Sequence, residues 1–184
     1  TGFMEQLSFM TEDQARTVRR EFGTPVFVYD RRTLEQRAQE ALAFPNAFGL
    51  TVRFAMKALP TAAVLRIFSG MGLHIDASSG FEAERAMLAG IPSEHIQITA
   101  QELPENLEAL IAKGVRFNAC SLHQLAIYGS LFPKTEISVR INPGLGSGHS
   151  NRTNVGGPSA SFGIWHEHTD EVLAFAAKHA LRLS

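Results

Sequence analysis

Apolar and polar side chains alternate in five short segments of this chain, and a stretch with apolar residues at helical spacing follows each of them. The alternating segments begin near residues 51, 73, 95, 115 and 136, so the repeat is regular. In the first segment one phase holds Val52, Phe54 and Met56, and the other holds Thr51, Arg53, Ala55 and Lys57. Strands that alternate with helices at this spacing predict an α/β fold with a parallel sheet.

The boundaries of the expected elements follow from these periods and from the turn residues between them. Strands are expected over residues 26–29, 51–56, 73–77, 95–99, 115–119 and 136–142, and a sixth unit of the repeat begins at 181–184. Helices are expected over 33–44, after Pro60, and over 80–89, 104–113, 122–131 and 169–180. Gly90 and Gly114 stand where helices end. The glycine-rich segment 143–163 is expected to be a functional or disordered loop, and its spacing does not match a phosphate-binding loop.

Every expected strand has one apolar and one polar face. Strands of an open, doubly wound sheet are covered on both faces and tend to be continuously apolar. The pattern therefore favours a (β/α)8 TIM barrel, in which helices pack outside and polar groups gather at the mouth. Such a barrel needs eight strands and about 250 residues, whereas about five units are present. We therefore expect an incomplete barrel that forms the N-terminal part of a longer enzyme, with a five-stranded flavodoxin-type domain as the alternative.

Composition narrows the functional classes. Of the 184 residues, 45% are hydrophobic and 19% charged, which is typical of a folded domain. The formal charge of -1 provides no basic surface for nucleic acid or an anionic membrane. No apolar run approaches the roughly 18 residues of a membrane span, and the first residues lack the features of a secretory signal. The single cysteine, Cys120, excludes an intrachain disulfide and favours a cytoplasmic location.

Lys57 is the strongest candidate for chemistry. It is expected to be the last residue of a strand, in the phase that faces the barrel interior. A lysine in a poorly solvated pocket has a lowered amine pKa and can attack a carbonyl to form a Schiff base. A strand-end lysine that reaches solvent is the ordinary alternative. We interpret Cys120 and Trp165 as packing residues, and His166 and His168 as solvent-facing side chains rather than metal ligands.

Several short motifs occur in a specific order. Residues 24–30 (TPVFVYD) are similar to T-P-x-x-V-Y-D, residues 54–58 (FAMKA) to Y-A-x-K-A, and residues 76–82 (DASSGFE) to D-x-x-S-x-x-E. Residues 140–144 (RINPG), 148–149 (GH), 156–158 (GGP) and 162–164 (FGI) continue the match. With these motifs the chain resembles the pyridoxal-phosphate enzymes of the alanine racemase fold. Within them it is most similar to the diaminopimelate decarboxylases and their relatives, the ornithine and arginine decarboxylases.

The resemblance implies roles for four residues. Lys57 is the implied catalytic residue and holds the cofactor, pyridoxal 5'-phosphate. Asp76 and Arg140 are implied to bind the same cofactor, and His149 is implied to contact the substrate. No metal is expected.

Two further features bear on the match. Ser79 and Glu82 fit the S-x-x-E motif, but the same pair also forms a capping box for the following helix. Ala160-Ser161 stands where the family has Ser-Lys, and Phe54 replaces a tyrosine.

The implied activity is decarboxylation of an amino acid, with meso-diaminopimelate as substrate and L-lysine as product. The alternatives are an ornithine- or arginine-type decarboxylase, an amino-acid racemase of the same fold, or a non-catalytic protein that binds pyridoxal phosphate. The resemblance divides the chain into residues 1–48, with a strand that belongs to a C-terminal β-domain plus a helix, and residues 49–184, the partial barrel. It also implies a homodimer, and we expect little or no catalysis from these 184 residues alone.

Overall fold

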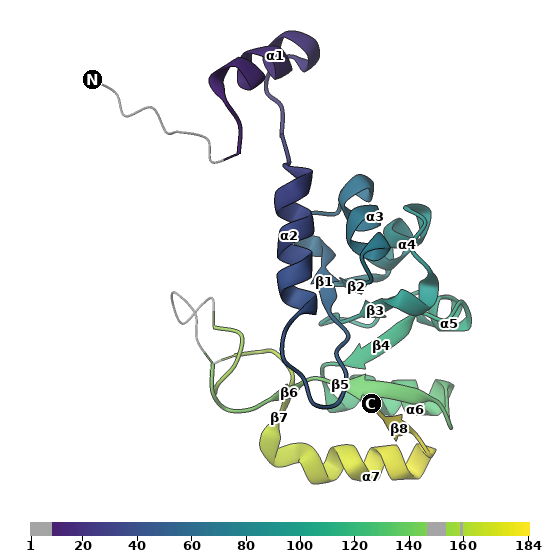
Figure 1. Ribbon diagram of the computed structural model, residues 1–184. Coiled ribbons are helices and arrows are strands. Elements are labelled where there is room, and N and C mark those ends of the chain that lie inside the picture. The colour runs from purple at the N-terminus through teal and green to yellow at the C-terminus, as the bar shows by residue number, and fades with distance from the viewer. Residues whose placement is uncertain (1–8, 147–153, 159) are drawn as a thin grey trace.

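A single parallel sheet organises the chain. The computed structural model describes residues 9–146, 154–158 and 160–184 (Figure 1). The six strands are β1 (Arg53–Ala55), β2 (His74–Ala77), β3 (Ile96–Ile98), β4 (Arg116–Ala119), β5 (Glu136–Val139) and β8 (Arg182–Leu183). They lie in the order β1-β2-β3-β4-β5-β8, and every neighbouring pair is parallel. A flavodoxin-type sheet reverses its strand order at a switch point, so the barrel prediction is confirmed and the alternative fold is wrong.

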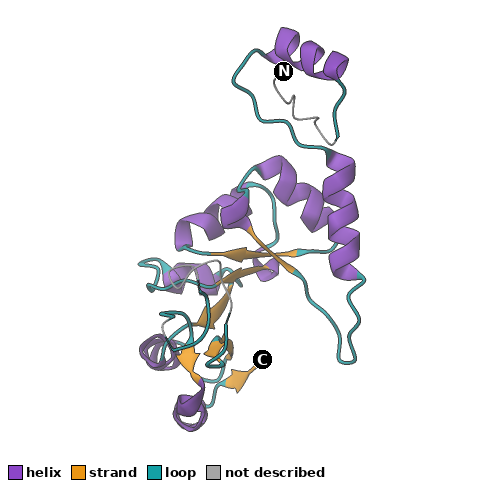
Figure 2. Cartoon of the chain, turned by 90° about the vertical axis from the view of Figure 1, so that its left-hand side faces the viewer, coloured by secondary structure: helices purple, strands orange, loops and turns teal. Residues whose placement is uncertain are grey.

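Helices connect the consecutive strands (Figures 1 and 2). They are α3 (Ala62–Gly70), α4 (Gly80–Leu88), α5 (Leu107–Ala112), α6 (Leu122–Leu131) and α7 (Thr169–His179). Single turns of 3-10 helix occur at Met56–Ala58, Ser93–His95 and His166–His168. The helix predicted over 122–131 has those bounds, whereas α5 begins three residues later than predicted, after the N-cap residue Asn106. Among the described helices none is both long and apolar enough to cross a bilayer.

The apolar phase of each strand packs under these helices. Its most deeply buried members include Ile75, Ile96, Ile98, Phe117 and Ile137, which are at most 2% exposed. They form one core cluster with apolar residues of the helices. The opposite, polar phase therefore lies on the inner face of the sheet, as the alternation predicts.

The N-terminal region differs most from expectation. Helix α1 (Glu12–Phe22) was not expected; a capping box between Thr11 and Gln14 begins it, and it buries no residue. Helix α2 (Arg31–Leu42) packs against α3. The strand expected at 26–29 is absent from the described part of the chain, and Phe27 is 88% exposed. Its expected neighbours belong to another domain, so its pairing and the domain boundary at residue 48 stay predictions.

The strand expected over 136–142 is interrupted at Arg140. Strand β5 ends at Val139, and β6 (Ile141–Asn142) pairs instead with β7 (Ile164–Trp165) in a second, two-stranded sheet. Gly163, the residue before β7, lets the chain pass close enough to Arg140 for β7 to pair with β6. Its φ is +81°, and a Cβ there would lie 2.9 Å from the carbonyl oxygen of Arg140. Periodicity alone predicts one long strand, because it does not report this close return of the chain.

Candidate active site

Lys57 lies at the carboxyl end of β1. It occupies the 3-10 turn Met56–Ala58 rather than the last strand position, so that part of the prediction is wrong. Met56 is fully buried and anchors the turn, whereas the side chain of Lys57 is exposed. The described residues therefore do not enclose the amine in the poorly solvated pocket that the sequence suggested.

Asp76 lies on the neighbouring strand β2, on the polar inner face. Its Oδ1 accepts a hydrogen bond of 2.6 Å from the hydroxyl of Thr99, and Asn118 donates from Nδ2 to the same hydroxyl oxygen at 3.3 Å. Burial raises the pKa of Asp76, and the Thr99 hydrogen bond and the positive charges of Arg53, Lys57 and Arg140 oppose that rise. Asp76 is thus a half-buried carboxyl group next to the candidate lysine.

Arg140 follows β5 and turns toward the same end of the sheet. Its guanidinium carbon lies 4.8 Å from the centre of the Phe162 ring, close enough for a cation–π contact. Its backbone N–H donates to the carbonyl of Ala119 at 2.8 Å, which ties the residue to the end of β4. The aromatic residue lies near the end of the glycine-rich segment 143–163, so this segment returns to the candidate site.

Lys57, Arg140 and Phe162 line one cavity of about 740 Å³ at the carboxyl ends of the strands. The other walls come from the loops that follow β2 and β3, including Ser78 and Thr99. A cavity of this size is typical of small-molecule sites. In parallel βα barrels this end of the strands carries the chemistry.

The glycine-rich loop is closed at its base by Asn142, which is 4% exposed. Its Oδ1 accepts hydrogen bonds from the backbone N–H groups of Gly144 (3.1 Å) and Gly157 (2.9 Å), and its Nδ2 donates to the carbonyl of Gly157 (3.0 Å). These two amides are therefore engaged within the loop. Residues 147–153 lie outside the described residues, so the expectation that the loop does not bind phosphate stays a prediction. His149 lies outside the described residues.

Two side chains fix the loops that form the cavity wall. Glu82 accepts a hydrogen bond from the backbone N–H of Ser78 at 2.7 Å, while Ser79 caps α4 through the N–H of Glu82. Two units later, Gln124 accepts from the N–H of Cys120 at 2.7 Å, and its own backbone N–H donates to the hydroxyl of Ser121. The predicted cap by Ser79 is confirmed, but the capping box is not complete, because Glu82 accepts from the N–H of Ser78 instead of that of Ser79.

Gln124 also reaches across to the preceding unit. Its amide nitrogen Nε2 donates to the carbonyls of Ala100 and Gln101 at 3.0 and 2.9 Å. Sequence reasoning missed this residue, and it missed Thr99 and Asn118 too. The repeated S-x-x-[E/Q] pattern after β2 and β4 was the available signal for Gln124. The polar phase at the strand ends was the signal for the other two.

The remaining candidates behave as packing or surface residues. Cys120 is buried, burial raises the pKa of its thiol, and Trp165 packs beside the ring of His166. His166 and His168 are exposed, and His168 pairs with Glu171. Among the described residues no cluster of three or more His, Cys, Asp or Glu side chains could hold a metal ion.

The strands of the parallel sheet follow chain order, and a lysine and an arginine line one cavity at their carboxyl ends. These features are typical of a βα barrel that binds a small molecule, and the chain forms part of such a barrel. Residues 32–184 match the family described as "Pyridoxal-dependent decarboxylase, pyridoxal binding domain". The chain belongs to this family. The predicted family and cofactor class are thereby confirmed.

Relatives and solved structures agree with this family. The chain is 38% identical to the diaminopimelate decarboxylase of Streptomyces coelicolor and 34% identical to that of Escherichia coli K12, over 89% of this chain. It spans only 37% and 39% of those two proteins. A crystal structure of a diaminopimelate decarboxylase superposes with a TM-score of 0.83 at 33% identity, and covers 94% of this chain and 41% of that one. A lysine/ornithine decarboxylase from Vibrio vulnificus, at 20% identity and a TM-score of 0.73, shares the fold.

Proposed function

We propose that this chain supplies the lysine-bearing part of a longer pyridoxal-phosphate-dependent decarboxylase, which converts meso-diaminopimelate to L-lysine and CO2. The observation that carries the proposal is the position of Lys57 beside Arg140 in the cavity at the carboxyl end of the strands. The substrate is inferred from the relatives at 34–38% identity, which are diaminopimelate decarboxylases. The match to less than two fifths of their length is the reason to expect a longer enzyme.

The donor set in the cavity suits one side of pyridoxal phosphate. Lys57 offers a primary amine for the cofactor's aldehyde, and Arg140 offers a cation next to an aromatic ring, that of Phe162. The positive charges of Lys57 and Arg140 act to lower the pKa of Asp76, so its carboxylate can balance the charge of the amine and the guanidinium. A phosphate site is not evident among the described residues, because the amides of Gly144 and Gly157 bond to Asn142.

When bound, pyridoxal phosphate supplies a ring that takes up the electron pair left when the Cα–carboxylate bond breaks and CO2 departs. Lys57 would hold the cofactor through Nζ, and the amine of Lys57, when free, could deliver a proton to Cα of the substrate. Arg140 would orient the cofactor from the carboxyl end of β5, and Asp76 would set the local charge near both residues. His149 is assigned to the substrate, as a proposal that rests on the motif alone.

The same proposal covers how the enzyme is assembled. The enzyme is a cytoplasmic homodimer, and its active site is completed by polypeptide beyond these 184 residues. The exposed segment 26–29 then pairs as a strand with a C-terminal β-domain, which accounts for the exposure of Phe27. The isolated chain is accordingly expected to have little or no activity.

The cofactor assignment is tested by borohydride reduction of the full-length enzyme with pyridoxal phosphate, followed by peptide mapping. Within this chain Lys57 competes with only three other lysines, Lys113, Lys134 and Lys178, which serve as internal controls. We expect the reduced adduct on Lys57 and its loss in Lys57→Ala. Equal labelling of all four lysines would contradict the assignment.

The substrate is tested by CO2 release from meso-diaminopimelate, with ornithine and arginine as competing substrates. Lys57→Ala is expected to abolish release, because the residue both holds the cofactor and moves a proton. Labelling of Lys57 without CO2 release from any of the three would indicate a non-catalytic cofactor carrier. Labelling with interconversion of L- and D-amino acids would indicate a racemase.

A further inference from the structure

A group of charged side chains lies on the inner face of the sheet, near the amino-terminal ends of the strands and far from Lys57 along the strand direction. It consists of Arg53 on β1, Arg116 on β4, Glu136 on β5 and Arg182 on β8, and we call it the inner-face cluster. These residues belong to the polar phase, because their neighbours Phe117 and Ile137 are buried under the helices. The cluster contains three guanidinium groups and one carboxylate.

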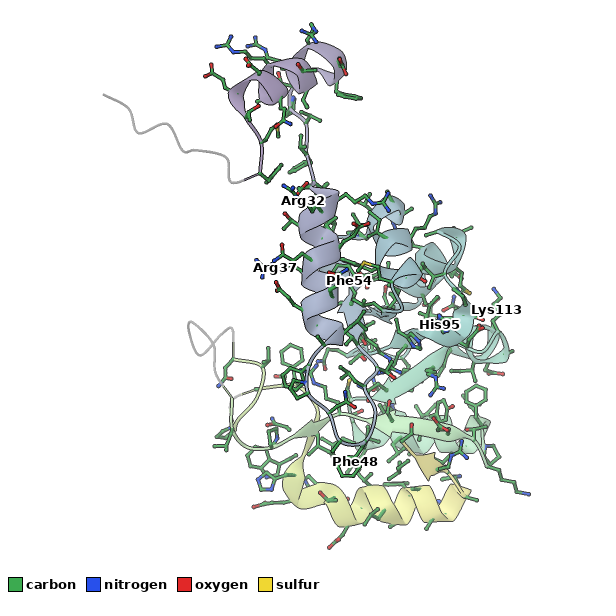
Figure 3. All side chains as sticks on the ribbon, in the orientation of Figure 1. Arg32, Arg37, Phe48, Phe54, His95 and Lys113 are labelled. Carbon is green, nitrogen blue, oxygen red and sulfur yellow. The ribbon has the colours of Figure 1, made fainter. Side chains whose placement is uncertain are left out.

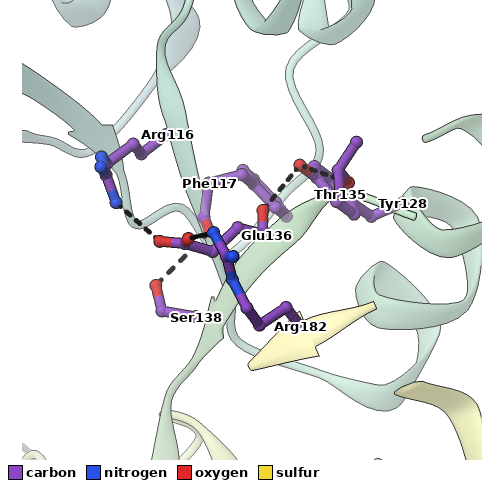
Figure 4. A network of polar contacts seen from close by, with 7 residues as sticks. All are labelled: Arg116, Phe117, Tyr128, Thr135, Glu136, Ser138 and Arg182. Carbon is purple, nitrogen blue, oxygen red and sulfur yellow. Dashed lines mark hydrogen bonds and ion pairs between the residues drawn. The ribbon is translucent and has the colours of Figure 1, made fainter. Parts of the chain in front are cut away.

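The carboxylate of Glu136 is already shared by two of the arginines. Arg116 donates from Nη1 to Oε1 at 2.9 Å, and Arg182 donates from Nη2 to the other oxygen, Oε2 (Figure 4). The Arg182 contact is the chief reason why the pKa of Glu136 lies below its usual value. Among the described residues, Glu136 is therefore paired with Arg116 and Arg182, and no hydrogen bond joins it to Arg53.

Arg53 has no hydrogen-bond acceptor for Nε among the described residues, although this atom is buried. Burial lowers the pKa of Arg53 and the charge of Arg116 lowers it further, while the carboxylate of Asp76 opposes the shift. The adjacent residue in the register, His74, has an equally unpaired Nδ1 and stacks its ring on His95 at 4.1 Å. Buried polar atoms in folded proteins are almost always paired, and a carboxylate is the strongest acceptor for a guanidinium N–H such as that of the half-buried Arg53.

The unpaired edge of β1 is where a neighbouring strand can supply that anion. It pairs with β2 on one edge, and within the described residues no strand covers its other edge. In a closed barrel a further parallel strand lies along that edge and directs alternate side chains to the same interior. The curated relatives contain the additional length for such strands, since this chain spans 37–39% of them.

We infer that the strand that pairs with the free edge of β1 carries an inward-facing Asp or Glu, and that this carboxylate accepts a hydrogen bond from Nε of Arg53. The occupant is thus a polypeptide strand with one acid opposite or diagonal to Arg53. A carboxylate fits better than a backbone carbonyl because the cluster holds more cations than anions. The ion pair fixes the register with which the sheet closes. Successive side chains of a strand point to opposite faces, so a slip of one residue would move the acid to the other face and break the contact.

The test uses the full-length enzyme and its structure. We expect a carboxylate oxygen within hydrogen-bond distance of Arg53 Nε, contributed by the strand next to β1. A continuation of the chain without an acid on that strand, or a structure in which water or a carbonyl accepts from Arg53, would overturn the inference. Neither readout depends on the reaction that the enzyme catalyses, so the proposed function can fail while this inference holds.

A double-mutant cycle measures whether the pair acts as a unit. Arg53→Met and neutralisation of the partner acid should each raise the unfolded-to-folded ratio at a fixed urea concentration by about tenfold, because each leaves a partly buried polar group without its hydrogen-bond partner. The double variant should be no worse than the poorer single variant. Simple addition of the two effects would contradict the pairing. If Arg53→Met does not fold, Arg53→Lys replaces it, with a smaller effect expected.

The control cycle uses Arg37 and Glu40 on α2. Arg37 pairs with Glu40 at 2.5 Å, and its side chain is exposed and points away from α3 (Figure 3). Exposed pairs contribute little. Arg37→Met and Glu40→Gln should therefore change the same ratio by less than about threefold.

Discussion

Replacement of Gln124 by methionine should destabilise the protein and loosen one wall of the candidate active site. Gln124 is 2% exposed and makes three hydrogen bonds with backbone groups of two βα units. Methionine keeps the volume of the side chain but removes all three. The N–H of Cys120 and the carbonyl of Ala100 then stay buried without a partner, whereas the exposed Gln101 can bond to water.

The magnitude follows from those two buried groups. An unsatisfied buried donor or acceptor costs about 1–3 kcal/mol, so Gln124→Met should lower the free energy of unfolding by about 2–6 kcal/mol. The assay is urea denaturation of the full-length enzyme, followed by circular dichroism. Pyridoxal phosphate affinity should fall as well, because the loop from Thr99 to Asn106 lines the cavity.

The equivalent residue two units earlier provides a matched control. Glu82 occupies the same place after Ser79, and Glu82→Gln keeps an oxygen that can accept from the N–H of Ser78. This variant should lose less than about 1 kcal/mol. A Gln124→Met variant as stable as Glu82→Gln would refute the idea that the three backbone contacts matter.

Three further predictions concern the same region. Burial raises the pKa of Asp76 in the folded state, so its ionisation opposes folding as pH rises. Asp76→Asn should therefore raise the melting temperature of the cofactor-free protein at pH 7, and this gain should vanish below about pH 4. A gain that stays constant with pH would contradict this reasoning. Asn142→Ala should speed amide hydrogen exchange at Gly144 and Gly157, measured by mass spectrometry, and unchanged exchange would show that other contacts close the loop. Gly163→Ala should cost about 1–3 kcal/mol in urea denaturation, because φ is positive there, and a neutral effect would mean that the turn can rearrange.

Strand alternation predicted the sheet because burial on one face leaves a simple period of two in the sequence. The observed strand order confirmed the barrel, and α6 matched its predicted bounds. The position of Lys57 beside Arg140 was likewise predictable from the motifs, since both lie where strands end. The roles of Lys57, Asp76, Arg140 and His149 toward cofactor and substrate stay predictions.

Other features depend on contacts that no local pattern reports. The return of the chain at Gly163, which splits the expected strand after Val139, depends on residues more than twenty positions apart. Helix α1 buries no residue, although Ala15, Val18 and Phe22 stand at helical spacing, so its existence was readable from the sequence and was missed. The exposure of Lys57 contradicts the expected enclosure, because a strand-end position in the sequence does not show whether other side chains will cover the amine.

The order of the strands along the sheet has a consequence for biosynthesis. Each new strand docks beside the one made just before it, so contacts can form while the ribosome is still translating. The other edge of β1 is the exception, because within the described residues no strand pairs with it and a later strand has to cover it. Until that strand is made, this edge is a site for misassembly.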